Sequence, residues 1–214
     1  MSVMLAVPFF GILAFSLLSE QRENTKAFAV TAVQPTILTF NSKKNSDNGT
    51  FRTKWLTAIG TKKIQCKVDF ESGFKNNQNI SGIKHCGGLV IKDTSTANAV
   101  IIKSGNGSIG GSNPVGVYSA THNEKAYLVL DFSAKPVDYV AFLDIDQTAT
   151  GGFVEFVNNT KVPISFETTA GTGNSAEFFG IFRNNMPRIK RVLLDASGDG
   201  LWGIDNIEYG VVGY

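Results

Sequence analysis

Short apolar runs, separated by turn-forming residues, constrain the fold of this chain more than any other sequence feature. They recur roughly every 10 to 15 residues, and side chains alternate within them. Tyr127, Val129 and Asp131 share one face of their run, while Leu128 and Leu130 share the other. No run shows a sustained helical period. The pattern predicts an all-β protein, a β-sandwich or jelly roll of two antiparallel sheets, and not an alternating βαβ fold.

The expected strands are joined by loops rich in Gly, Asn and Ser. The run 152–157 alternates most clearly, with Phe153 and Glu155 opposed to Val154 and Phe156. The main loops are expected at residues 41–50, 71–82 and 105–116. The strands are expected within residues 35–40, 51–59, 62–70, 88–91, 97–102, 126–132, 138–145, 152–157, 162–167, 177–182, 188–194 and 202–210.

Composition agrees with one large sandwich domain. Hydrophobic residues make up 43% of the 214-residue chain and charged residues only 18%, so the core is large and the surface relies on uncharged polar groups. The counts of 22 Gly and 16 Phe suit strands and tight turns better than long helices. A formal net charge of +2 gives no reason to expect a nucleic-acid partner.

The N-terminus resembles a targeting segment. Residues 5–18 form an apolar run that is short for a membrane span, and Ala27-Phe28-Ala29 has the small-x-small form of a signal-peptidase site. These features predict a signal peptide over residues 1–29, a mature domain over 30–214 and a secreted or cell-surface protein with no membrane contact after cleavage. No Lys or Arg precedes the apolar run, so an uncleaved membrane anchor is the alternative.

Cys66 and Cys86 are the only cysteines. In an exported protein this even count predicts a disulfide, which would stabilise the fold by roughly 3 kcal/mol through loop entropy. Two unpaired thiols are the alternative. The chain has only two histidines, His85 and His122, and no Cys-x-x-Cys, so the cysteines are not expected to bind a metal.

A loose set of motifs runs through residues 65–210, namely Val68-Asp-Phe-Glu, Gly87-Gly-Leu-Val-Ile, Leu128-Val-Leu-Asp-Phe, Pro136-Val-Asp-Tyr-Val-Ala-Phe, Phe178-Phe-Gly-Ile, Ile189-Lys-Arg-Val and Trp202-Gly-Ile-Asp-Asn-Ile-Glu-Tyr-Gly. Their order resembles a broad class of secreted bacterial β-sandwich proteins, common in cyanobacteria and proteobacteria, many of which carry a C-terminal PEP-CTERM sorting tag. The resemblance implies a galactose-binding-like jelly roll, a fold that many carbohydrate-binding modules share. This chain departs from tagged members because no such tag follows Tyr209, and we expect no anchoring by the C-terminus.

Acidic residues near both ends of the motif region suggest a structural calcium site. In many jelly-roll binding modules a cation links the first strand to the last, and Ca²⁺ takes carboxylate and carbonyl oxygens. Asp69 or Glu71 at the start and Asp205 at the end match that arrangement. The alternative is that Asp205 caps a strand end or pairs with a lysine, while Asp69 and Glu71 are ordinary turn residues.

The sequence contains no recognisable catalytic arrangement, and we expect a non-enzymatic protein. It lacks Gly-x-Ser-x-Gly, and neither histidine has a recognisable setting. Asp144 and Asp146 flank Ile145 and would point to one side of a strand. They form either a carboxylate pair or the polar end of a strand.

Ligand binding through aromatic side chains is the favoured interpretation, because aromatic rings stack on the C–H faces of sugars. Tyr118 borders the Gly-rich loop 105–116, which contains Asn113, so these two residues and Trp55 are the binding candidates. Tyr127, Tyr139 and Trp202 are the other aromatics with this potential, and burial in the core is the alternative for all of them.

Two functions follow from these features. The first is a secreted, non-catalytic binding protein of the cell surface or extracellular matrix, with extracellular polysaccharide as its partner. The second is a self-assembling structural subunit of a filament or layer, in which residues 30–40 lend a strand to the sheet edge of a neighbouring copy.

Overall fold

The computed structural model describes residues 36–42, 44–60, 64–70, 73–94, 100–104, 115–119, 126–145, 151–166, 176–195 and 203–211. These residues belong to one compact unit, Gln34–Tyr214. The expected signal peptide, residues 1–29, lies outside the described residues. No helix among the described residues is both long enough and apolar enough to span a membrane.

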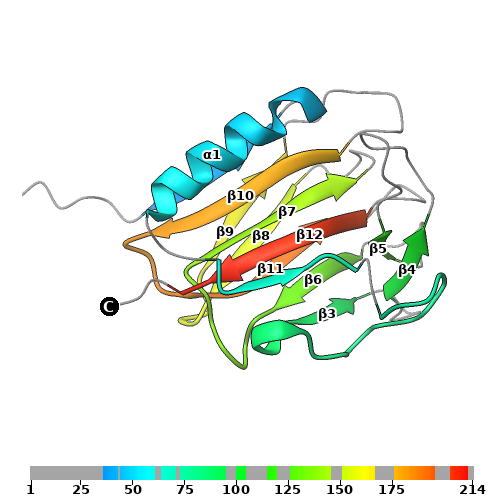
Figure 1. Ribbon diagram of the computed structural model, residues 1–214. Coiled ribbons are helices and arrows are strands. Elements are labelled where there is room, and N and C mark those ends of the chain that lie inside the picture. The colour runs from blue at the N-terminus through cyan, green and yellow to red at the C-terminus, as the bar shows by residue number, and fades with distance from the viewer. Residues whose placement is uncertain are drawn as a thin grey trace, which may run out of the picture. The chain divides into compact units, whose positions relative to one another are not determined.

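Two antiparallel sheets form the unit, which confirms the predicted sandwich (Figure 1). One sheet has the order β1-β10-β7-β12-β5-β4, with β2 also paired to β12, and the other has the order β3-β6-β11-β8-β9. The strands are β1 (Thr36–Asn41), β2 (Cys66–Val68), β3 (Val90–Asp93), β4 (Val100–Ser104), β5 (Val115–Ser119), β6 (Tyr127–Asp131), β7 (Tyr139–Ile145), β8 (Gly151–Phe156), β9 (Lys161–Ser165), β10 (Ala176–Asn184), β11 (Ile189–Asp195) and β12 (Gly203–Gly210).

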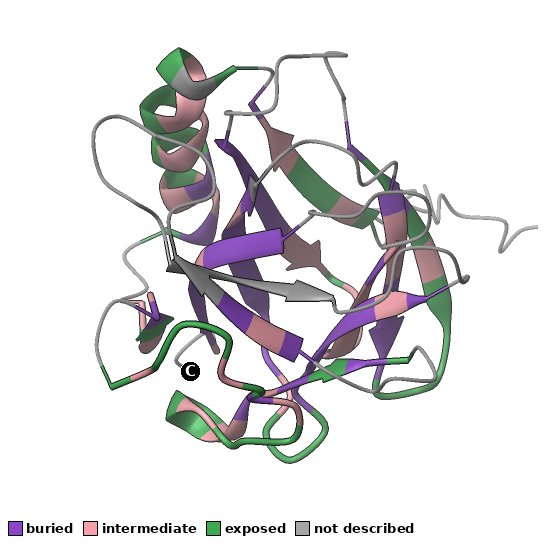
Figure 2. Cartoon of the chain, turned by 90° about the vertical axis from the view of Figure 1, so that its right-hand side faces the viewer, coloured by how far each residue is buried: buried purple, intermediate pink, exposed green. Residues whose placement is uncertain are grey.

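The core lies between the sheets and is built from alternate residues of each strand. Leu128 and Leu130 of β6 contribute to it from the five-stranded sheet, while Val140 and Phe142 of β7 contribute from the seven-stranded sheet. The rings of Phe142 and Phe179 are 5.5 Å apart. Figure 2 shows the buried residues concentrated where the strands face one another. Burial of these alternating apolar side chains is the main term that stabilises the sandwich.

A helix replaces one of the expected strands. The sequence predicts a strand over residues 51–59, but these residues lie in α1 (Asn48–Ile59), which follows a 3₁₀ turn, η1 (Asn45–Asp47). Phe51, Trp55 and Ile59 recur every four residues, so they share one helix face that packs on the outer side of β10. The strand prediction is wrong because burial of this helix face against the sheet outweighs the local preference for a strand. Thr53 and Thr57, which usually favour strands, donate their hydroxyls to carbonyls one helical turn earlier.

Gly180 of β10 lets the helix approach the sheet. A Cβ atom at Gly180 would lie 2.7 Å from Cδ1 of Trp55, so only glycine leaves room for the indole. The Trp55 ring also contacts Tyr139 and Phe178, and its Nε1 donates to the carbonyl of Ile181 at 3.2 Å. Figure 1 shows α1 lying along β10. This cluster anchors the helix to the seven-stranded sheet.

The predicted disulfide between Cys66 and Cys86 is confirmed, and it joins β2 to the short 3₁₀ turn η2 (Cys86–Gly88). Tyr209 of β12 donates its hydroxyl to the carbonyl of Cys86. Burial raises the pKa of Tyr209 to about 12, so this hydroxyl keeps its proton and remains a donor at neutral pH.

The segment expected to act as a donor strand is used within its own chain. Residues 36–41, most of which belong to the expected donor segment 30–40, form β1, which pairs with β10 of the same chain. Residues 30–35 lie outside the described residues. Exchange of this strand between copies therefore stays a prediction.

Candidate functional site

The outer face of the five-stranded sheet carries the best-placed aromatic side chains among the described residues. Leu128 and Leu130 of β6 point into the core, so Tyr127, Val129 and Asp131 point to the opposite side. The register places Val129 beside Leu193 of β11, and Leu193 beside Phe153 of β8. Alternation therefore brings Tyr127, Val129, Leu193 and Phe153 to one surface, which we call the aromatic face.

Tyr127 and Phe153 are the aromatic pair of this face. Their ring centroids are 6.3 Å apart and the ring planes are inclined by 63°, and both side chains are half-buried. Thr94 fixes the backbone of Tyr127, because its N–H donates to the Tyr127 carbonyl at 3.0 Å and its hydroxyl accepts from the Tyr127 N–H at 2.8 Å. The pair thus offers a partly exposed apolar platform on a rigid part of the sheet.

Gly152 sets the position of Phe153. A Cβ atom at Gly152 would collide with the carbonyl oxygen of Leu193, so β8 approaches β11 at a distance that only glycine permits there. This approach keeps Phe153 beside Leu193. The next residue with the same orientation along β8 is Glu155, which begins the charged part of the face.

A ladder of alternating charges crosses the same face beside the aromatic pair. Lys92 Nζ lies 2.6 Å from Asp131 Oδ2, and Arg191 Nε lies 3.6 Å from Asp131 Oδ1. Arg191 Nη1 lies 3.7 Å from Glu155 Oε1, to which Lys190 Nζ approaches at 3.0 Å. The ladder therefore connects β3, β6, β11 and β8.

The two signs of charge lie at different depths in the ladder. The side chains of Asp131 and Glu155 are each only 8% exposed, while those of Lys92 and Arg191 are 47% and 37% exposed. The ammonium and guanidinium groups therefore face solvent above the carboxylates. Since the contacts of Arg191 to both acids are long, its N–H donors are available to a ligand.

The ladder fixes the charge of Asp131. Burial by itself raises the pKa of this carboxyl, but hydrogen bonds from Lys92 and Ser133, together with the positive charge of Lys92, outweigh burial and lower the pKa to about 2. Asp131 is therefore ionised at every physiological pH. It holds Lys92 in place on the face.

None of the three ligand-binding residues predicted from the sequence can be assigned to this surface. Trp55 of α1 is fully buried between the helix and the sheet. The prediction that it stacks on a sugar is therefore wrong, because its ring packs against β10. Tyr139 is also fully buried. Asn113 and Trp202 lie outside the described residues. For Tyr118 only the backbone is described, in β5 beside Gly203 of β12.

The residues predicted to bind calcium lie in different environments. β2 pairs with β12, so the early strand does meet the last one. Asp69 follows β2, its side chain is 44% exposed and its Oδ2 lies 3.7 Å from Lys67 Nζ. Asp205 is buried and accepts a 2.9 Å hydrogen bond from Asn206. Glu71 lies outside the described residues. Within the described ranges, no group of three or more His, Cys, Asp or Glu side chains is placed to hold a metal.

The sequence left open whether Asp144 and Asp146 form a carboxylate pair or the polar end of a strand, and only Asp144 is described. Asp144 of β7 is aligned with Glu177 of β10 across the sheet, and both are buried, while Asp146 lies outside the described residues. His85 packs against Phe70 and Phe74, each with its ring centroid 5.9 Å away, and burial lowers the pKa of His85. His85 is thus a neutral member of an aromatic cluster.

Comparison with known proteins gives little guidance. No protein-family model matches the chain, and no curated protein matches it. One solved structure with a similar fold is a carbohydrate-binding module from Cellvibrio mixtus lichenase 5A, in complex with cellotriose. It shares 12% sequence identity at a TM-score of 0.34, over 65% of this chain and 100% of the module. At this level of similarity the two proteins need not share a function.

Proposed function

We propose that this protein is a non-catalytic binding protein that holds a polysaccharide on the aromatic face of its five-stranded sheet and works outside the cell. The observation that carries the proposal is the partly exposed pair Tyr127 and Phe153 beside a row of charged hydrogen-bonding groups. Aromatic platforms suit the C–H faces of sugar rings, and fixed side-chain donors suit sugar hydroxyl and carboxylate groups. The disulfide supports an oxidising compartment.

The depth of the charges favours an acidic polysaccharide. A ligand on this face would meet Lys92 and Arg191 first, because the carboxylates of Asp131 and Glu155 lie beneath them. An Arg guanidinium can hold a sugar carboxylate through two parallel hydrogen bonds. We therefore expect a uronate-containing chain to bind more tightly than a neutral one, and added salt to weaken the binding.

Affinity electrophoresis tests the proposal. Native gels cast with polygalacturonate should retard the full chain more strongly than gels with neutral xylan. Tyr127→Ala and Phe153→Ala should each reduce the retardation, because stacking on one aromatic ring is lost. Phe51→Ala, which alters a half-buried aromatic on α1, should migrate like the unmodified protein. Equal retardation of all these variants, or of none of them, would refute binding at the aromatic face.

A further inference from the structure

Strand β1 lies at an edge of the seven-stranded sheet. Among the described residues, its backbone pairs only with β10, in an uninterrupted register from Thr36 opposite Asn184 to Asn41 opposite Phe179. The Ser42 N–H donates to the Phe178 carbonyl at 3.0 Å, which identifies this pair as hydrogen-bonded. Because antiparallel pairs alternate between the two types, Ile37, Thr39 and Asn41 turn their N–H and C=O groups away from β10.

Besides β1, the strand orders of the two sheets end at β4, β3 and β9, and backbone covers the first two of these ends. At β4, Ile102 N–H donates to the Gln78 carbonyl at 2.9 Å, and Asn77 N–H donates to the Ile102 carbonyl at 2.7 Å. At β3, Gly82 N–H donates to the Ile91 carbonyl at 3.1 Å. Residues 77–85 therefore cap both of these edges and leave little room for another strand.

The third edge, β9, is blocked by proline. Phe156 N–H donates to the Thr160 carbonyl at 3.0 Å, and the register from there places Lys161, Pro163 and Ser165 with their backbone groups toward the open side. Pro163 has no N–H to donate, and it occupies the middle of this row. Proline and lysine are the residues that natural sheets use to prevent pairing at an edge.

Among the described residues, strand β1 has none of these protections. Its sequence, Thr36-Ile-Leu-Thr-Phe-Asn41, contains no charge, no proline and no bulge, and β-branched and aromatic residues dominate it. Leu38 is 38% exposed although it is a large apolar residue. An edge of this composition is a template for another uncharged strand.

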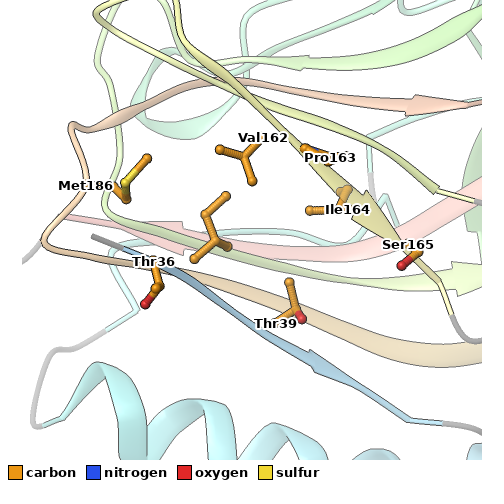
Figure 3. Close-up of a pocket in the computed structure, with 8 residues that line it drawn as sticks. Thr36, Thr39, Val162, Pro163, Ile164, Ser165 and Met186 are labelled. Carbon is orange, nitrogen blue, oxygen red and sulfur yellow. The ribbon is translucent and has the colours of Figure 1, made fainter. Parts of the chain in front are cut away.

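A groove runs beside this edge, between the two sheets. It has a volume of about 410 Å³ and is lined by Thr36, Ile37 and Thr39 of β1, by residues 162–165 of β9, and by Met186. Figure 3 shows the β1 residues on one side and the β9 residues on the other. None of the described residues that line the groove is charged, so whatever covers it should itself be uncharged.

We propose that the occupant of this edge is β1 of a second copy, paired antiparallel about a two-fold axis at Thr39. This register sets Thr39 against Thr39 of the second copy and Ile37 against its Asn41. All three residues whose backbone groups point away from β10 then form hydrogen-bonded pairs. Leu38 then lies beside Phe40 of the second copy on the outer side. The inward side chains of the second strand extend over the uncharged groove.

The partner is a second copy because the uncharged edge of β1 has to pair with a strand that is also uncharged. The edge offers six residues without charge and needs an equally uncharged extended strand. Every copy presents such a strand with its backbone already held by β10, so the strand need not be ordered first in order to pair. The dimer would be one continuous sheet through both copies. It would leave both aromatic faces open, although the pairing does not depend on their function.

The test compares the mass of the full chain in solution with that of two variants at Thr39. Light scattering after size-exclusion chromatography should show a concentration-dependent shift from 23.1 kDa to twice that mass. Thr39→Pro removes the backbone N–H that points away from β10, just as Pro163 lacks an N–H at the edge of β9. It should weaken dimerisation by about 30-fold or more, since two intermolecular hydrogen bonds at the axis are lost. Thr39→Ala keeps the N–H and should dimerise like the unmodified chain.

Cross-linking gives a second readout if Thr39→Pro is poorly folded. Under mild oxidation, Thr39→Cys should form a covalent dimer, because the two Thr39 residues meet at the axis within reach of a disulfide. Val157→Cys, at a position that is 46% exposed on a turn, should stay monomeric. A monomeric unmodified chain at all concentrations, or equal cross-linking of both cysteine variants, would overturn the proposal.

Discussion

Neutralising Asp131 should remove a defined, pH-dependent part of the stability. Its pKa is about 2 in the folded protein, against 3.8 as the ordinary value. A shift of this size corresponds to about 2.4 kcal/mol at 1.36 kcal/mol per pH unit. Because the Lys92 side chain is 47% exposed, solvent screening reduces the contribution that we expect to about 1–2 kcal/mol.

The sign follows from the lowered pKa. Folding favours the ionised carboxylate, so the contribution is complete above pH 3.8 and disappears as the pH falls toward 2. Asp131→Asn should therefore be less stable than the unmodified protein by about 1–2 kcal/mol near neutral pH. The difference should shrink steadily as the pH is lowered through that window.

Urea denaturation over this pH range measures the effect. Comparing the variant with the unmodified protein at each pH cancels the titration of the other acids. Lys92→Met is the matched control, because it removes the cation closest to Asp131. In a chain that already carries Lys92→Met, adding Asp131→Asn should produce little of the pH-dependent loss of stability. A difference that stays constant from neutral pH to about pH 2 would refute the assignment of this pKa to the ladder.

Three further predictions concern the packing, the disulfide and the site. Gly180→Ala should cost about 1–3 kcal/mol of unfolding free energy, because its methyl would press on Trp55 at 2.7 Å. Gly49→Ala, on the helix that carries Trp55 and with open space around it, should stabilise by up to about 0.5 kcal/mol in thermal melts. Replacing Cys66 and Cys86 together by Ser should lower the denaturation free energy by about 3 kcal/mol, since their loop spans 20 residues; no loss would show that the loop is ordered without the bond. Arg191→Gln should weaken binding to polygalacturonate and make the remaining binding less sensitive to salt, as binding titrations at two ionic strengths would show.

Strand alternation made the sandwich predictable, since most of the apolar runs map onto strands of the expected sheets. The helix was missed for a physical reason. Phe51, Trp55 and Ile59 do have a helical spacing, but only three residues carry it and β-favouring threonines separate them. Its position is decided by the room that Gly180 leaves for the indole, which is a contact between residues far apart in the chain.

The candidate site was only partly readable from the sequence. The alternation of β6 and of β8 places Tyr127 with Asp131 and Phe153 with Glu155 on single faces, and this shared pattern of an aromatic and an acid could have pointed to one surface. The sequence could not show that β11 lies between these strands and brings Arg191 to both acids. It also could not distinguish Trp55, which is core, from Tyr127, which is not. The secreted location, the calcium site and the resemblance to tagged bacterial proteins stay predictions.

Chemical-shift mapping of the isotope-labelled chain during titration with polygalacturonate fragments shows directly which residues bind the ligand. We expect the largest changes at Tyr127, Phe153 and Arg191, with little change at Trp55 and along β10. Changes centred instead on Asn113 and Tyr118, or no changes at saturating ligand, would contradict binding at the aromatic face.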